Sequence, residues 1–326
     1  MDGNGIISVV RLIMPILGGS SKVLAGIGIP AGGSSGPVNW PDLIAGDGFV
    51  KYTPTNIVST LGAGTAGVNA ITMSSSTLSI KLNGQGRGIT GTGTSGLSSI
   101  NYQISYDKTG TGTFSYTGYD DWFQPGTPFE CGIFEVGGTA GKYIGGQNQD
   151  ANLMGSLSID NGTVYSWKPS STRAVIWFTG GTSGDAIFQY YLTGKVIRMH
   201  MAYFNTTGSS KAVRMARGGD PDLDAFATNN GIINSTKVYG SSQTSGHTFA
   251  IYCPGNGYPT GTAIITGWGS TNPAVDAFLG TNAGNGDNAL FAGVDCGTIA
   301  AGSEVGLNIY YCFGTSYTDA YSQIGV

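Results

Sequence analysis

The amino-acid sequence predicts an all-β protein, a large antiparallel β-sandwich with an extended N-terminal arm. Three observations lead to this prediction. The chain has 56 glycines in 326 residues and only 10% charged residues, whereas an average soluble domain is about 7% glycine and about one quarter charged. Its polar residues are largely Ser, Thr, Asn and Tyr, which suit strand surfaces better than helical ones. Short apolar runs also recur, separated by turn residues.

The composition also limits the class of protein. Hydrophobic residues make up 40% of the chain and aromatic residues 11%, which is enough for a buried core. The formal net charge is −4. The basic residues do not cluster, and the nearest approach to a cluster is Lys211, Arg214 and Arg217. We therefore expect no nucleic-acid partner.

Residues 1–45 differ from the rest and form the predicted arm, with residues 46–326 as the β-sandwich body. Apolar residues recur at helical spacing and predict a short amphipathic helix that ends near Pro15. These candidate assembly residues are Ile6, Val9, Val10, Ile13 and Leu17. A Gly/Ser/Pro-rich stretch follows. The apolar side of the helix needs a cover, so the arm is either a strap on its own domain or a docking arm toward other copies and other particle proteins.

From Asp47 onward, short runs with strand character alternate with Gly- and Asn-rich turns. The predicted strands are residues 77–82, 100–106, 173–179, 188–192, 195–204, 248–253, 262–268 and 305–313. Two stretches, 222–228 and 272–279, could each hold a single helical turn. Such regular punctuation predicts one large sandwich or two abutting ones.

The cysteines and the N-terminus bear on localisation. The four cysteines lack a CxxC spacing, so either two disulfides or four free thiols fit. The start of the chain lacks the basic region of a secretory signal, and its apolar run is shorter than the roughly 20 residues of a membrane span. We expect a virion protein, with an extracellular or cell-surface location as the alternative.

Two strings match catalytic or cofactor motifs but lack the required context. Residues 62–67 match GxGxxG without a strand–helix unit around them, and residues 32–36 match GxSxG between two prolines. The chain has two histidines, His200 and His247, and both are expected to be structural. We therefore predict no catalytic site and no cofactor other than calcium.

The calcium prediction rests on three carboxylates in one loop, Asp220, Asp222 and Asp224. An EF-hand does not fit, because Ala225 stands where that loop requires glycine. A turn or helix cap is the alternative interpretation.

A second acidic region lies among aromatic residues. Asp120 and Asp121 precede Trp122, and Glu130 and Glu135 follow. Glycosidases use two carboxylates about 5 to 9.5 Å apart. These residues therefore suggest carbohydrate contact through Trp122, Asp120 and Asp121, or catalysis, or core packing.

The C-terminal part contains the string Gly284-Asn-Gly-Asp287, followed by Ala300-Ala-Gly-Ser-Glu304 and an aromatic strand. With residues 217–224, this order resembles a β-sandwich module of phage and bacterial surface proteins, similar to the supersandwich of aldose-epimerase-like folds. The resemblance covers about residues 170–318. It implies a tight turn at 300–303 and a final strand that alternates toward one face. The epimerase pattern of His and Glu residues is absent, so no activity is carried over.

Three functional hypotheses follow. The first is a non-enzymatic structural protein of a phage particle, such as a capsid-decorating, fibre or tail-associated subunit. The second is a carbohydrate-binding or adhesive module that contacts cell-surface glycan. The third is a polysaccharide-active enzyme that uses Asp120, Asp121, Glu130 or Glu135.

Overall fold

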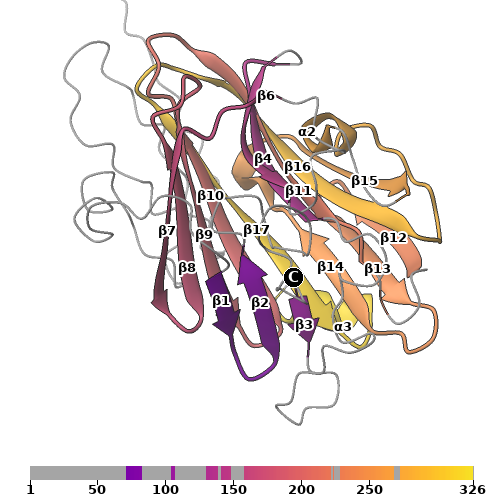
Figure 1. The fold of residues 1–326 in the computed structure, drawn as a ribbon. Helices are drawn as coiled ribbons and strands as arrows, with labels where there is room; N and C mark the ends of the chain where they lie inside the picture. Colours follow the sequence, from indigo (N-terminus) through magenta and orange to yellow (C-terminus); the bar gives the residue numbers. More distant parts are fainter. Residues whose placement is uncertain are drawn as a thin grey trace, which may run out of the picture. The chain divides into compact units, whose positions relative to one another are not determined.

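The computed structural model describes residues 71–82, 104–106, 130–138, 141–147, 158–221, 223, 228–267 and 272–325. Within these ranges strands dominate and form three sheets (Figure 1). This confirms the all-β fold class. The predicted arm and its boundary at residue 45 lie outside the described residues.

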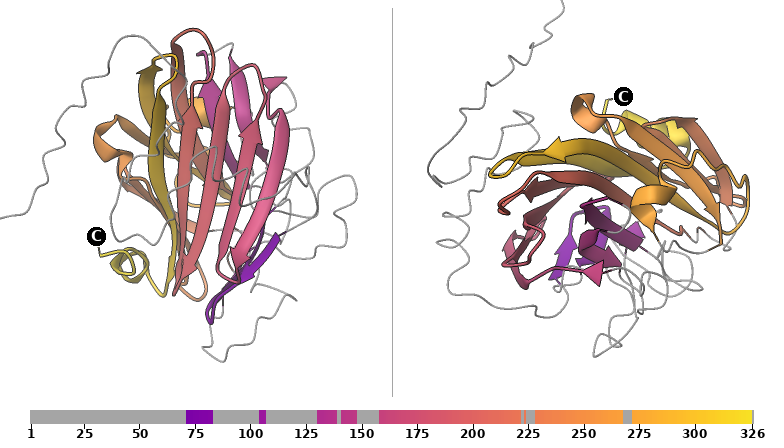
Figure 2. Two further views of the ribbon diagram at one scale, coloured as in Figure 1. Left: turned by 90° about the vertical axis from the view of Figure 1, so that its left-hand side faces the viewer. Right: turned by 90° about the horizontal axis from the view of Figure 1, so that it is seen from above.

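The largest sheet has eight antiparallel strands, several of which lie side by side in Figure 2 (left). In spatial order they are β12 (Thr228–Asn234), β13 (Lys237–Ser242), β14 (Thr248–Tyr252), β17 (Glu304–Gly314), β10 (Val196–Phe204), β9 (Asp185–Thr193), β8 (Arg173–Thr179) and β7 (Thr163–Ser170).

A six-stranded sheet and a three-stranded sheet accompany it. The six strands are, in order, β15 (Thr260–Thr266), β16 (Asn288–Ile299), β11 (Lys211–Gly219), β4 (Glu130–Val136), β5 (Lys142–Gln147) and β6 (Ser158–Ile159). The three strands are β1 (Ile71–Ser74), β2 (Leu78–Leu82) and β3 (Ile104–Tyr106). The described helical segments are η1 (Gly255–Gly257), α2 (Pro273–Asp276) and α3 (Tyr317–Ser322).

The core lies between the facing sides of the sheets. Phe134 of β4 contacts two rings of the eight-stranded sheet, with centroid distances of 6.0 Å to Phe188 and 5.9 Å to Tyr203. The β1–β2 hairpin adds Met73 and Ile80 to the same cluster. We call the sides that meet here the inner faces and the opposite sides the outer faces. This packing of sheets confirms the predicted sandwich.

The β16–β17 hairpin has the predicted tight turn. The Ser303 N–H donates to the Ala300 carbonyl, and Gly302 adopts a φ of 73°, which favours a residue without Cβ. In β17 the alternate residues on the inner face are Val305, Leu307, Ile309 and Tyr311. The alternation predicted for this strand is therefore confirmed.

Several strands were not predicted, notably β4, β11 and β16. These strands contain Gly, Ala and charged residues, which lower local strand propensity; the last three residues of β11, for example, are Arg217, Gly218 and Gly219. Between their partners they are nonetheless continuous strands. Glycine is needed at Gly218, because a Cβ there would lie 2.3 Å from a Phe291 ring atom.

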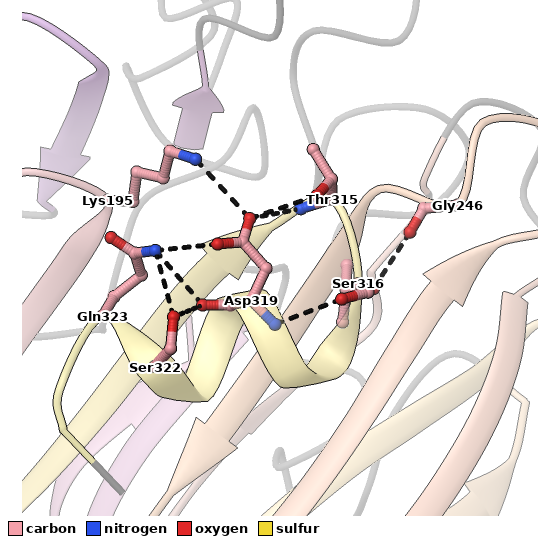
Figure 3. Close-up of polar contacts among 8 residues, drawn as sticks. Lys195, Gly246, Thr315, Ser316, Asp319, Ser322 and Gln323 are labelled. Atoms are coloured by element: carbon pink, nitrogen blue, oxygen red, sulfur yellow. Dashed lines mark hydrogen bonds and ion pairs between the residues drawn. The ribbon is translucent and has the colours of Figure 1, made fainter.

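Helix α2 confirms the helical turn predicted in 272–279, whereas α3 was not predicted. The Asp319 N–H donates to the Ser316 side chain at the N-terminus of α3 (Figure 3). Asp319 Oδ2 also accepts from the Thr315 N–H at 2.8 Å and lies 3.6 Å from Lys195 Nζ. These contacts attach the helix to the β9–β10 hairpin. In the described part of the chain, no helix has the length and hydropathy of a membrane span.

Candidate functional site

The outer face of the eight-stranded sheet carries a row of cationic and tyrosine side chains. Residues opposite one another in neighbouring strands point to the same face, so the strand register defines such rows. One register line crosses six strands, from β8 to β13. We call its members the cation–tyrosine row: Arg173, Tyr191, Arg198, Tyr310, Tyr252 and Lys237.

The described side-chain contacts within the cation–tyrosine row fall into two groups, one at each end. The guanidinium carbon of Arg173 lies 4.6 Å from the ring centroid of Tyr191. The rings of Tyr252 and Tyr310 stack with centroids 5.7 Å apart, and Lys237 Nζ lies 5.5 Å from the Tyr252 centroid. Tyr310 is 6% exposed, and the other five members are half-buried. Each cation–π contact of this kind contributes about 0.5–1 kcal/mol.

The next register line on this face carries three polar side chains beside one valine. It joins Val175, Gln189, His200 and Asn308. His200 Nδ1 donates to Asn308 Oδ1 at 2.8 Å, so the Nδ1 proton is fixed by this bond. Gln189, His200 and Asn308 are all buried. The two lines together place amides and an imidazole beside arginine and tyrosine.

This combination suits sugar recognition. Half-buried guanidinium and ammonium groups can donate to hydroxyl groups, and tyrosine rings offer an apolar surface for the C–H face of a sugar ring. Burial raises the pKa of Tyr252, so its phenol stays neutral. The outer face can therefore hold an uncharged ring against tyrosine and an anionic group against arginine or lysine.

The sequence contains one signal for this row, in the strand predicted at 195–204. Arg198 and His200 interrupt the apolar strand predicted at 195–204, on alternate positions that face the same side. His200 was expected to be structural, and its buried bond to Asn308 agrees with that interpretation. The partners of Arg198 in the row come from strands far away in the sequence.

The outer face of the six-stranded sheet holds a small cavity. It has a volume of about 100 Å³ and is lined by Glu135, Arg214 and Asp295, among others. Arg214 Nε lies 3.2 Å from Asp295 Oδ2. Burial raises the pKa of Glu135, and the nearby Arg214 opposes that shift. A site for a small organic ligand is usually at least about 300 Å³, so this cavity suits water molecules rather than a sugar ring.

Glu130 and Glu135 cannot act together on one bond. They lie on opposite faces of β4, because an offset of five residues reverses the side in a strand. Glu130 faces the core, where its Oε1 lies 2.8 Å from Arg217 Nη2 and accepts a hydrogen bond of 2.8 Å from the Tyr311 hydroxyl. Both members of the ion pair are 0% exposed. Glu130 is therefore a structural ion-pair partner.

Asp220, one of the predicted calcium ligands, has an acidic neighbour that was not predicted, Asp287. Asp220 is buried, and the carboxyl of Asp287 lies close enough to interact with it. Burial, together with the Asp287 charge, raises the pKa of Asp220 well above its usual range. The described residues contain no group of three or more acidic, His or Cys side chains that could hold a metal. Asp222 and Asp224 lie outside the described residues, so the three-carboxylate site stays a prediction.

Other predicted site residues also lie outside the described residues. These are Asp120, Asp121 and Trp122 of the carbohydrate prediction, the assembly residues Ile6 to Leu17, and both glycine-rich motifs. The four cysteines are described, and all are buried free thiols. Burial raises the pKa of the Cys253 thiol to about 12, which keeps it protonated and unreactive.

The comparisons with known proteins give only a loose likeness. No family model and no curated protein matches the chain. Solved structures with similar strand arrangements include a putative aldose 1-epimerase from Escherichia coli K12, at 8% identity and a TM-score of 0.42, covering 76% of this chain and 99% of that one. An aldose epimerase homologue from C. elegans shares 11% identity at a TM-score of 0.43, with coverage of 76% and 99%. A polysaccharide lyase shares 10% identity at a TM-score of 0.38, and the match covers 81% of this chain and 34% of the lyase chain. The neighbours include aldose-epimerase-like β-sandwich folds at low identity, and no activity is inferred from them.

Proposed function

We propose that this protein is a non-catalytic, glycan-binding surface component that binds sugars on the outer face of its eight-stranded sheet. The observation that carries the proposal is the open end of the cation–tyrosine row, where the half-buried side chains of Arg173 and Tyr191 touch each other. At the other end of the row, Tyr252 and Tyr310 pack against α3. Half-buried tyrosines keep ring area that a ligand can cover.

The context we propose is a virus particle, most simply a phage fibre, tail or capsid-decorating subunit. Its support is the composition, with 56 glycines, 10% charged residues and strand-rich polar surfaces. A protein of this kind needs a rigid scaffold for attachment, and a large sandwich provides one. The assembly element is the arm at residues 1–45. A truncation without it that still joins the particle or oligomer would refute the arm's role.

Catalysis is the weaker alternative. The pair Glu130 and Glu135 is divided between the two faces of β4, and Glu130 is held in a buried ion pair. A two-carboxylate mechanism needs both groups on one side of one bond. Release of reducing sugar from a polysaccharide by the purified chain would favour an enzyme and overturn the non-catalytic proposal.

The binding proposal is tested on a glycan array with the full chain and two tyrosine variants. Tyr191→Ala removes a ring from the row, whereas Tyr258→Ala removes an exposed ring outside it. We expect Tyr191→Ala to weaken binding about tenfold or more and Tyr258→Ala to leave it unchanged. Equal binding by both variants, or no binding by the parent chain, would refute the proposal.

A further inference from the structure

We propose that the small cavity on the outer face of the six-stranded sheet binds a primary ammonium group at the end of an alkyl chain. The cavity has a volume of about 100 Å³ and lies where β4, β11 and β16 run side by side (Figure 1). It belongs to a different sheet from the cation–tyrosine row, so the proposal is independent of glycan binding. The cavity takes the head group of the ligand, and the rest of the ligand remains outside.

A single register line brings the polar residues of this site together. Glu135 of β4 lies opposite Tyr143 of β5 on one side and opposite Arg214 of β11 on the other. Arg214 in turn lies opposite Asp295 of β16. Residues opposite one another in antiparallel strands point to the same face, with Cβ atoms about 4.5–5.5 Å apart. The sheet therefore places two carboxyl groups and one guanidinium group around one small space.

A β-bulge borders the cavity. Val213 pairs with Gly297 and Arg214 pairs with Asp295, so Cys296 has no register partner in β11. A bulge bends its strand and changes the direction of neighbouring side chains. Gly138, just after β4, also lines the cavity, and a Cβ at that residue would meet no atom within 4 Å. The bulge and this glycine leave room beside Arg214.

Glu135 brings a buried carboxyl group to the cavity. The residue is 1% exposed, and within the described part of the chain its Oε2 atom has no hydrogen-bond partner. The Tyr143 hydroxyl donates a hydrogen bond to this carboxyl group and accepts one from the Asn272 side chain. The hydroxyl proton of Tyr143 is therefore directed at Glu135. A buried carboxylate oxygen without a donor is destabilising, so a ligand that offers an N–H group to Oε2 is favoured.

The described contacts of Arg214 lie away from that oxygen. Its Nε lies 3.2 Å from Asp295 Oδ2, and its guanidinium carbon lies 5.7 Å from the ring centroid of Phe278. Arg214 and Asp295 balance each other's charge, which leaves the carboxylate of Glu135 as the excess charge of the register line. Burial raises the pKa of Glu135 even though Arg214 opposes that shift, and a further cation beside it would favour the charged form. The matching ligand is therefore a single positive charge that carries N–H donors.

The size of the cavity selects among cations. A cavity of about 150 Å³ can hold a benzene ring, and one water molecule takes up about 30 Å³ in the liquid. A space of about 100 Å³ therefore admits an ammonium group with a few methylene groups. A metal ion fits less well, because the described residues contain no group of three or more acidic, His or Cys side chains that could hold one. The same head group occurs on free alkylamines and on lysine side chains.

The experiment titrates the isotope-labelled full chain with butylamine and follows the backbone amide signals by NMR. At about pH 8 the amine is protonated, since an alkylammonium group has a pKa of about 10.4. Butyltrimethylammonium keeps the charge but has no N–H donor, and butanol keeps a donor without the charge. We expect butylamine to shift the signals of the residues that line the cavity, and both control compounds to bind at least about tenfold more weakly. A short peptide with one lysine and blocked ends separates the two sources: tighter binding of the peptide than of butylamine indicates a protein ligand, and weaker binding indicates a free amine.

Three variants locate the binding. Glu135→Gln keeps the shape of the side chain without its charge and should weaken butylamine binding about tenfold or more. Ala212→Leu adds bulk at an exposed residue that lines the cavity and should weaken binding as well. The control is Asp287→Asn, which removes an exposed carboxylate next to the start of β16, about 25 Å along the strand from Asp295, and should leave binding unchanged. Thermal melting of each variant confirms that it is folded.

Three outcomes would overturn the proposal. Equal binding of butylamine and butyltrimethylammonium would show that the N–H donors are not used. Unchanged binding by Glu135→Gln or by Ala212→Leu would place the amine outside this cavity. Absence of butylamine binding to the parent chain would remove the site altogether. None of these outcomes bears on glycan binding, which is tested separately through Tyr191.

Discussion

Two pairs of consecutive tyrosines, Tyr190-Tyr191 and Tyr310-Tyr311, divide between the inner and outer faces of one sheet. Tyr190 and Tyr311 face the core, where their rings lie 5.1 Å and 5.5 Å from the guanidinium carbon of Arg217. Tyr191 and Tyr310 face outward and belong to the cation–tyrosine row. The same residue types therefore form an arginine–tyrosine group on each side of the sheet.

The two groups differ in how their charge is balanced. Arg217 has Glu130 as its buried counter-ion, and burial of both ions is complete. In the outer group, the described contacts of Arg173 and Lys237 are with tyrosine rings, and both side chains are half-buried. A closed ion pair fixes the packing of two sheets, whereas half-exposed cations can bind a ligand. Position relative to the core, rather than residue type, therefore separates the structural ion pair from the residues that we propose for binding.

The largest expected effect on stability comes from a substitution in the inner group, at the buried ion pair. Glu130→Gln leaves the Arg217 charge buried without its counter-ion, and we expect a loss of about 3–5 kcal/mol in the free energy of unfolding, measured with urea. The double variant Glu130→Gln with Arg217→Met removes both charges and should recover part of this loss. A Glu130→Gln protein as stable as the parent would show that the pair is not structural.

A smaller effect is expected where the outer face is covered by α3. The Tyr321 hydroxyl donates to the Val238 carbonyl at 2.9 Å and to the Ile251 carbonyl at 3.2 Å. Tyr321→Phe should therefore lower the free energy of unfolding by about 1–2 kcal/mol. The control is Tyr317→Phe, an exposed ring on the same helix, which should have almost no effect. Equal losses for the two variants would contradict this role of the Tyr321 hydroxyl.

A further test concerns a buried acid without a cation among its described contacts, in contrast to Glu130. The pKa of Asp220 is raised above the usual 3.8, so the folded protein binds this proton more tightly than the unfolded chain does. Its contribution to stability is therefore full below about 3.8 and is lost as pH rises through the raised value. Asp220→Asn cannot ionise, so its Tm should rise relative to the parent as pH increases through this window.

The comparison of Tm between the parent and Asp220→Asn can be repeated with added calcium. If calcium at neutral pH raises the Tm of the parent but not that of Asp220→Asn, then calcium holds Asp220 and Asp287, and the sequence-based calcium site gains support. If calcium leaves both Tm values unchanged, calcium does not hold these two residues, and the calcium prediction is wrong for Asp220.

The smallest expected effect on stability belongs to the outer group. Arg173→Gln removes a half-buried cation whose described contact is one tyrosine ring. We expect the free energy of unfolding to change by less than about 1 kcal/mol, while glycan binding weakens. A loss as large as that of Glu130→Gln would show that the row supports the fold and would remove the contrast between the two faces.

Much of the fold was predictable from local patterns. The predicted strand at 173–179 coincides with β8, and those at 195–204 and 305–313 differ from β10 and β17 by one residue at their ends. These strands are rich in β-branched and aromatic residues. Strands β11 and β16 were missed because they contain several glycines and alanines, β4 because Glu130, Gly132 and Glu135 interrupt its apolar residues, and helix α3 because it has only six residues. Their conformations depend on partners rather than on local propensity.

The sequence by itself determined the fold class, the tight turn at 300–303 and the alternation of Tyr310 and Tyr311 between two faces, since a strand reverses side at every residue. It could not determine which residues become neighbours across strands. Arg198 meets Tyr191 through a short hairpin, but its other neighbour, Tyr310, comes from β17 near the C-terminus. Likewise, Glu130 finds Arg217 only when two sheets pack. Register and sheet packing are set by the burial of the whole core, so tertiary structure alone decided where the cations and tyrosines meet.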